Sequence, residues 1–219
     1  MFYIVHIGKC GGGTIFIECK RRKIKFEKAH LRKPKIRKRY QYVILIRDPI
    51  NRFISAFNWK MFRCLTKEGQ NIHGKKPYQS INESIGFKFW KNINNFAENL
   101  FDENGNMNYM ASHLIKYSNH LQLDIHFYLE NLLKICNSKN CQVIRHEYYN
   151  EDINQVLNIN SVNTNNHKNN YRYSKYISDK GKQNLKKLLK KDYECFQILK
   201  NKNIIDDKYY QDIISGNFN

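Results

Sequence analysis

The strongest apolar patterns in this chain are two short uninterrupted runs. Residues 2–7 are almost wholly apolar and lead into glycines, and residues 42–46 are apolar and rich in β-branched side chains. Continuous runs of this length are typical of strands buried on both faces of a parallel sheet. Weaker patterns predict two further strands, over residues 24–28 and 141–144.

Apolar positions spaced three or four residues apart predict helices between and after these strands. One helix follows the glycines directly, and Pro49 suits the first turn of the next. We expect Asn150 to cap a later helix, and the polar segments 64–82 and 158–170 to be irregular. The predicted helices cover residues 14–23, 50–62, 87–101, 107–117, 125–136, 151–157 and 178–199.

The alternation of strands and helices predicts an α/β fold with three layers, in which helices flank a central parallel β-sheet. A chain of 219 residues is long enough for one sizeable core and too short for two comfortable ones. We therefore expect a single domain over residues 1–219.

The charge of the chain favours an anionic partner. The formal net charge is +19, and twelve of the twenty residues from Lys20 to Arg39 are Lys or Arg. Such a charge attracts polyanions, among them nucleic acids, acidic polysaccharides, anionic membrane surfaces and nucleotides. A run of this kind is equally typical of a solvated basic face, so the charge alone assigns no partner.

Apolar runs and cysteine spacing bear on where the chain works. The longest apolar runs fall far short of the roughly 20 residues that a membrane-spanning helix needs, and no charged leader precedes the first strand. The six cysteines lack paired C-x-x-C spacing, which argues against a zinc site. We therefore expect a cytoplasmic protein with free thiols, in which Cys136 and Cys141 would be bridged only if the chain is exported.

A glycine-rich segment joins the first predicted strand to the first predicted helix. Its sequence is Gly8-Lys9-Cys10-Gly11-Gly12-Gly13-Thr14. Glycines let backbone N–H groups approach an anion closely, and the start of a helix adds a favourable dipole. The segment therefore predicts a phosphate-binding loop.

The position of its lysine separates this loop from that of kinases and ATPases. Their loop follows G-x-x-x-x-G-K-[ST], in which the Lys reaches the outer phosphates and the next hydroxyl holds magnesium. Here Gly8 and Gly13 have the same separation, but Thr14 stands where that Lys is expected, and Lys9 lies on the strand side. The loop is suited to a single phosphate beside a Lys, and it offers no evident metal ligand.

Residues 6–14 resemble the 5′-phosphosulfate loop of the sulfotransferases that use 3′-phosphoadenylyl sulfate (PAPS). Loops of that family commonly have Pro where this chain has Gly8, and Ser or Thr where it has Cys10. The resemblance implies a P-loop-like fold. It also implies that the 5′-phosphate is held by Gly11, Gly12, Gly13 and Thr14.

A second segment matches the same family in the expected order. Residues 46–57 contain R-D-P at the end of a predicted strand and then R-x-x-S, similar to the family's 3′-phosphate motif. The resemblance implies that Arg47 and Ser55 bind the 3′-phosphate, and the Arg47 guanidinium can form paired hydrogen bonds with it. For Arg52, a structural ion pair and a ligand role are equally open.

Between these motifs, residues 28–31 read K-A-H-L, similar to a K-x-H-L element that several sulfotransferases carry. The resemblance implies that His30 is the general base and that Lys9 neutralises charge on the departing 5′-phosphate. Lys28 either assists His30 in catalysis or is simply part of the basic run. If His30 is not the base, the next candidates are Glu18 and Glu27.

The family resemblance implies transfer of a sulfuryl group from PAPS to an acceptor hydroxyl, in line and without a metal ion. Residues 176–196 resemble the end of the carbohydrate (Golgi-type) sulfotransferases, with D-Y-x-x-F at residues 192–196, and residues 143–149 resemble a strand and the acidic residue that follows it in the same group. The basic run around His30 favours an anionic saccharide acceptor. The sequence gives no indication of the oligomeric state.

Two other classes of protein fit parts of the sequence. A P-loop kinase or NTPase would need a Lys at position 14 and a carboxylate for magnesium, for which Asp48 is the obvious candidate. A basic module that binds nucleic acid or another polyanion fits the charge and the aromatic content. No helix-turn-helix, RNP or zinc-finger motif is present, so we expect no nucleic-acid partner.

Overall fold

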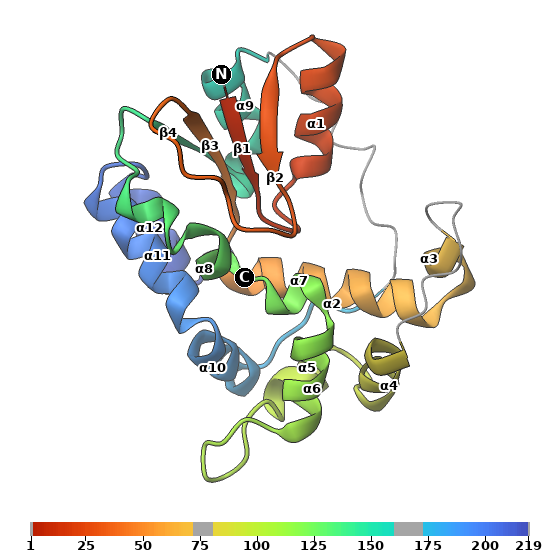
Figure 1. Ribbon diagram of the computed structural model, residues 1–219. Helices are drawn as coiled ribbons and strands as arrows, with labels where there is room; N and C mark the ends of the chain where they lie inside the picture. Colours follow the sequence, from red (N-terminus) through yellow and green to blue (C-terminus); the bar gives the residue numbers. More distant parts are fainter. Residues whose placement is uncertain (1, 72–80, 160–172, 219) are drawn as a thin grey trace. The chain divides into compact units, whose positions relative to one another are not determined.

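The fold contains a four-stranded parallel sheet flanked by helices (Figure 1). The computed structural model describes residues 2–71, 81–159 and 173–218. The strands lie in the order β2-β1-β3-β4, and each adjacent pair is parallel. They are β1 (Phe2–His6), β2 (Phe26–Ala29), β3 (Gln41–Ile46) and β4 (Cys141–Arg145). All four predicted strands are confirmed, as is the α/β fold with a central parallel sheet flanked by helices.

Helices connect and flank the strands, and most of them are short. The first six are α1 (Gly12–Arg21), α2 (Pro49–Leu65), α3 (Lys67–Asn71), α4 (Ile81–Phe89), α5 (Ile93–Glu98) and α6 (Tyr109–Tyr117). The others are α7 (Asn119–Gln122), α8 (Ile125–Leu129), α9 (Tyr149–Leu157), α10 (Asp179–Leu188), α11 (Lys190–Asn201) and α12 (Asp207–Ser215), with 3-10 turns η1 (Leu132–Lys134) and η2 (His146–Tyr148). Within the described ranges, none of the helices combines the length and apolar character that crossing a bilayer requires.

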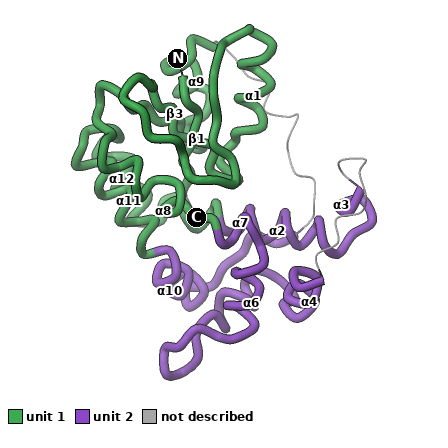
Figure 2. Tube along the Cα trace, in the orientation of Figure 1, with its two compact units in different colours: residues 1–52, 123–168, 190–219 green, residues 53–122, 169–189 purple. Residues whose placement is uncertain are grey.

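The chain divides into two compact units (Figure 2). Unit 1 comprises residues 1–52, 123–168 and 190–219 and contains the sheet, whose central strands β1 and β3 are almost entirely buried. Unit 2 comprises residues 53–122 and 169–189 and is helical where it is described. The single domain expected over residues 1–219 stays a prediction.

Unit 2 has its own core of aromatic side chains. Phe57 packs against both Phe87 and Phe96, with ring centroids 5.1 and 5.2 Å apart. A buried ion pair joins Lys60 on α2 to Glu83 on α4 at 2.8 Å. Because charged groups are rarely buried without a partner, this pair fixes the register of the two helices.

Three predicted helices are interrupted. The helix expected over residues 87–101 is divided in two, because α4 stops at Phe89. The Asn92 side chain then caps the separate helix α5 by accepting a 2.8 Å hydrogen bond from the Asn95 N–H. The helix expected over 178–199 divides at Leu189 into α10 and α11. The helix expected over 125–136 ends at Leu129, and only the turn η1 follows.

Other differences concern the ends of elements. Asn150 does not cap α9, because the turn η2 runs directly into the helix and places Asn150 inside it. Helix α12 is absent from the sequence-based prediction, and α3 lies within a segment expected to be irregular. Most of the loop expected over 158–170, and residues 72–80, lie outside the described residues.

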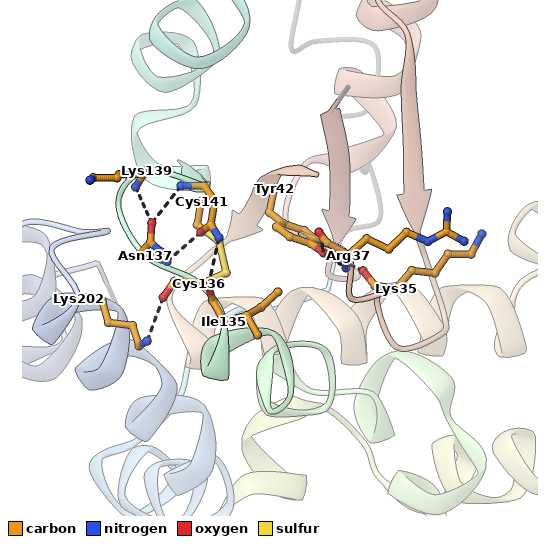
Figure 3. Close-up of a disulfide and its surroundings, with 10 residues drawn as sticks. Lys35, Arg37, Tyr42, Ile135, Cys136, Asn137, Lys139, Cys141 and Lys202 are labelled. Atoms are coloured by element: carbon orange, nitrogen blue, oxygen red, sulfur yellow. Dashed lines mark hydrogen bonds between the residues drawn. A yellow bond between two sulfur atoms is a disulfide. The ribbon is translucent and has the colours of Figure 1, made fainter. Parts of the chain in front are cut away.

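A disulfide joins Cys136 to Cys141, the first residue of β4 (Figure 3). The Asn137 side chain folds the intervening turn by accepting a 2.9 Å hydrogen bond from the Lys139 N–H, and the Cys141 N–H donates to the Asn137 carbonyl at 3.0 Å. This turn brings the two Cα atoms to 5.6 Å. The expectation of free thiols is therefore wrong for this pair. It is confirmed for the four remaining cysteines, all buried: Cys10, Cys19, Cys64 and Cys195.

Candidate functional site

The carboxyl ends of the parallel strands bring three predicted motifs to one edge of the sheet. Strand β1 ends at His6 and leads into the glycine-rich loop. Strand β2 ends immediately before His30, and β3 ends immediately before Arg47. In open parallel sheets, ligands bind outside this edge. The topology therefore gathers the loop, the proposed base and the R-D-P motif within unit 1.

The loop between β1 and α1 has an unusual backbone conformation. Gly11 at the N-cap of α1 has φ +85°, and Lys9 has φ +73°, a region that residues with a side chain rarely adopt. The Cys10 N–H donates to the Ile7 carbonyl at 3.2 Å and closes the turn. Since Gly11 provides no capping side chain, the first turn of α1 presents its N–H groups in the way that anion-binding helix starts do.

Aromatic rings approach two of the loop glycines so closely that neither position has room for a side chain. A Cβ at Gly12 would lie 2.1 Å from the His6 ring, and a Cβ at Gly11 would lie 2.6 Å from the Tyr149 ring. The Tyr149 hydroxyl also donates a 2.9 Å hydrogen bond to the Gly11 carbonyl. Tyr149 is the first residue of α9, so α9 helps to fix the loop.

Two cations converge on the strand side of the loop. The Arg47 Nη1 donates a 3.3 Å hydrogen bond to the Lys9 carbonyl, which makes the R-D-P motif a direct neighbour of the loop. Burial, and then the positive charge of Arg47, lower the pKa of Lys9 to about 8. A dianionic phosphate group beside these two side chains would relieve their mutual repulsion.

His30 lies against the last residue of β1. Its Nδ1 is 3.4 Å from the His6 carbonyl, and its ring stacks on the His6 ring with centroids 4.2 Å apart and planes 13° apart. Burial lowers the pKa of His30, and the charge of Lys28 acts in the same direction, whereas the hydrogen bond to His6 opposes them. His30 is therefore neutral at neutral pH, the state in which a general base accepts a proton.

The R-D-P turn is held by contacts that make Asp48 structural. Asp48 is fully buried, and its carboxylate caps α2 by accepting a 2.7 Å hydrogen bond from the Asn51 N–H. The Asp48 N–H donates to Glu147 Oε1 at 2.9 Å, and Glu147 Oε2 accepts from the Tyr209 hydroxyl at 2.9 Å. A buried helix cap is poorly placed to hold magnesium beside a nucleotide, which weakens the kinase alternative.

Arg52 and Ser55, the next two residues of the predicted 3′-phosphate motif, lie on α2 in different surroundings. Arg52 has no exposed surface. Burial and the charge of Asp124 raise the pKa of the buried Asp192 to about 7, although the charge of Arg52 acts in the opposite direction. The structure therefore favours the structural role for Arg52. Ser55 is partly buried but belongs to unit 2, and its contact with the 3′-phosphate stays a prediction.

Three residues at this edge were given no role in the site by the sequence. His6 and Tyr149 pack against loop glycines, and Glu147 holds the R-D-P turn. Tyr149 and Glu147 lie about a hundred residues or more from their partners, so no local pattern marks them.

In the part of the chain that the structure describes, no group of three or more His, Cys, Asp or Glu side chains is arranged to hold a metal ion.

Comparison with known proteins identifies the family. Residues 18–198 match the sequence model described as the sulfotransferase family. No curated protein matches the chain. The matched range contains His30, Arg47 and Ser55 but begins after the glycine-rich loop, so the loop is assigned from its own sequence and geometry. Because the match spans well over half of the chain, and the parallel α/β fold agrees with it, this chain belongs to the sulfotransferase family.

Proposed function

We propose that this protein transfers a sulfuryl group from PAPS to a hydroxyl group of a carbohydrate. The contact between Arg47 and the Lys9 carbonyl carries the proposal, because it makes the predicted 5′- and 3′-phosphate motifs neighbours. PAPS carries both phosphates on one nucleoside and supplies the activated sulfuryl group. A kinase has no need of a 3′-phosphate site.

The loop residues fit a phosphate group. Gly11 and Gly12 keep the loop free of side chains where a Cβ would collide with Tyr149 and His6. The backbone N–H groups from Gly11 to Thr14, with the Thr14 hydroxyl, would hold the 5′-phosphate. Such donors are fixed before the reaction begins, and preorganised electrostatic stabilisation is usually the largest contribution to catalysis.

Two cations and one hydroxyl complete the proposed donor site. Lys9 would neutralise the charge that develops on the 5′-phosphate as the sulfuryl group leaves. Arg47 and Ser55 would hold the 3′-phosphate and so fix the nucleotide along the sheet edge. A charge-assisted contact from Arg47 is stronger than a neutral hydrogen bond, which suits a group whose position sets the register.

His30 would accept the proton of the acceptor hydroxyl during in-line attack. Its hydrogen bond to the His6 carbonyl requires a proton on Nδ1, since a carbonyl only accepts. The lone pair of the neutral ring is then on Nε2, which would receive the proton. A base in this position contributes roughly 10²- to 10⁴-fold in rate.

The basic segment, residues 20–39, supports an anionic saccharide as the acceptor. Its Lys and Arg side chains are exposed and surround His30 in sequence. Lys33 pairs with Glu130 at 2.7 Å and Lys35 with Glu27 at 3.5 Å, but acidic residues are far fewer here than basic ones. A positive field of this kind raises the local concentration of an anionic polymer and weakens as salt is added.

Incubation with labelled PAPS and a panel of acceptors tests the proposal. We expect transfer to an acidic polysaccharide, weaker transfer to a neutral saccharide of similar length and least transfer to a phenol. His30→Ala should lower turnover by roughly 10²-fold or more while adenosine 3′,5′-bisphosphate still binds. His126→Ala, which alters a histidine on α8 outside the proposed site, should leave turnover unchanged. Failure of the wild-type protein to bind adenosine 3′,5′-bisphosphate would refute the proposed donor.

The disulfide bears on where this reaction would take place. A cytoplasmic location stays a prediction, and the Cys136–Cys141 bond argues against it because cytosolic thiols are kept reduced. We infer that the protein works in an oxidising compartment. Peptide mass mapping of protein from its native source, alkylated without reduction, tests this, and alkylated Cys136 and Cys141 would contradict it.

A further inference from the structure

His6 contacts both the proposed base and the phosphate loop. Its ring stacks on His30 at 4.2 Å and meets the Phe16 ring edge-on at 5.0 Å. The same ring occupies the space beside Gly12, where an added Cβ would lie 2.1 Å from His6 Cδ2. One flat side chain at the end of β1 is therefore enclosed by β2, α1 and the loop.

The ring of His6 is held in a buried, uncharged state. Its Nδ1 is buried and has no hydrogen-bond partner among the described residues. Burial, followed by His30, Lys28 and Lys9, lowers the pKa of His6 to about 3. Of these three, the two lysines are charged at neutral pH, and the Lys28 ammonium lies 4.0 Å from the centre of the Phe16 ring that borders His6. His6 is thus neutral at neutral pH.

A neutral stacked ring suits a base that becomes charged during the reaction. When His30 takes up a proton it becomes an imidazolium, and the face of a neutral aromatic ring attracts a cation. The His6 carbonyl meanwhile holds the His30 Nδ1 proton. Both contacts come from one residue, which is itself wedged against the loop that would hold the donor.

We propose that His6 is a positioning residue that fixes the orientation and tautomer of His30 relative to the phosphate loop. The stack sets the plane of the His30 ring, the carbonyl sets its tautomer, and the contact with Gly12 fixes both relative to the loop. The catalytic consequence rests on the proposed function, whereas the effect on His30 itself does not.

Two substitutions of similar bulk separate this role from plain packing. His6→Phe keeps a flat ring without ring nitrogens, and His6→Leu fills the space beside Gly12 without a flat ring. Thermal unfolding and binding of adenosine 3′,5′-bisphosphate check that both variants fold and keep the loop. His126→Ala is the control for a histidine outside the site.

Nuclear magnetic resonance titration of His30 tests the contact without any need for turnover. In the wild type and in His6→Phe we expect the Nδ1–H tautomer and a pKa below the ordinary histidine value. In His6→Leu the imidazolium form of His30 loses the stacked ring that favours it, so the pKa of His30 should fall further below that value, while the backbone carbonyl of residue 6 keeps the Nδ1–H tautomer. Identical titration of His30 in His6→Leu and the wild type would overturn the inference.

Steady-state rates test the catalytic consequence. We expect His6→Leu to lower kcat by about 10- to 100-fold, as misplacement of a reacting group does, with little change in nucleotide affinity. His6→Phe should retain most of the wild-type kcat. If His6→Phe loses as much as His6→Leu, the nitrogens of His6 matter and the inference is wrong. If the titration results are as expected but neither the wild type nor any variant transfers sulfuryl groups, the proposed function is wrong and the role of His6 in positioning His30 still holds.

Discussion

At the carboxyl ends of β1 and β2, the side chains of Lys9 and His30 both have pKa values below their ordinary ones, and the proposed reaction needs these two groups in opposite charge states. Burial and the neighbouring Arg47 lower the pKa of Lys9 to about 8. Burial, aided by Lys28, lowers the pKa of His30. Lys9 must be protonated to neutralise a phosphate, whereas His30 must be neutral to accept a proton. Both conditions are met together only between the two pKa values.

This opposition predicts a bell-shaped dependence of kcat/KM on pH. The rate should rise with pH as His30 loses its proton, at a pH below the ordinary histidine pKa of about 6.5. It should fall again as Lys9 loses its proton near pH 8 in the free enzyme. Lys9→Arg keeps the charge at all these pH values, so initial rates of that variant should show no alkaline fall. An unchanged alkaline limb in Lys9→Arg would assign it to another group.

Tyr149 offers a second test at the scale of one atom. Tyr149→Phe keeps the ring that packs on Gly11 and removes the hydroxyl that bonds to the Gly11 carbonyl. A hydrogen bond of this kind contributes about 1 kcal/mol, so adenosine 3′,5′-bisphosphate should bind about fivefold more weakly by calorimetry. Tyr109→Phe, at a tyrosine that is 79% exposed, is the matched control. If both variants bind adenosine 3′,5′-bisphosphate with equal affinity, the Tyr149 hydroxyl does not help to hold the loop.

At the scale of elements, the buried strands were the most predictable part of the fold. Strands β1 and β3 are buried on both faces, so their apolar runs are continuous and need no partner to be recognised. Because all strands are parallel, motifs that follow β1, β2 and β3 had to meet at one edge. The convergence of the loop, His30 and Arg47 was therefore predictable from the order of the motifs.

Helix boundaries and supporting residues were less predictable, for physical reasons. Apolar spacing continues through Leu189, so the division between α10 and α11 leaves no mark in the pattern. Helix α12 has a recognisable start, because Asp206 is a capping residue and accepts a hydrogen bond from the Tyr209 N–H at 2.7 Å. The contacts of Tyr149 with Gly11 join segments far apart in sequence and depend on the folded sheet.

The turn into α1 can be tested with a pair of glycine substitutions. Gly11 and Gly105 both have positive φ, +85° and +78°. Alanine in this conformation costs about 1–2 kcal/mol, so both Gly11→Ala and Gly105→Ala should lower the free energy of unfolding. Only Gly11→Ala also meets the Tyr149 ring, and only it should abolish binding of adenosine 3′,5′-bisphosphate. Retained binding in a folded Gly11→Ala variant would show that the loop does not hold the phosphate.

For the whole molecule, the disulfide makes stability depend on redox conditions. The bond closes a loop with a sequence separation of 5 at the entrance to β4. Closing so short a loop contributes about 2 kcal/mol by the chain-entropy estimate. Reduction should therefore lower the midpoint of urea unfolding in the wild type. The double variant Cys136→Ser, Cys141→Ser should unfold at the lower urea midpoint both with and without reductant. A wild-type midpoint that reduction leaves unchanged would contradict the prediction.

The position of β2 at the edge of the sheet gives the basic segment a second consequence. An outer strand exposes backbone groups that can pair with another copy of the chain, and short strands bearing lysine resist such pairing. Strand β2 has four residues, and Lys25 and Lys28 are exposed beside and on it. We therefore expect the charge that would attract an acidic polymer also to oppose pairing of β2 between copies of the protein. An excess of polyanion should screen that repulsion and promote self-association along β2.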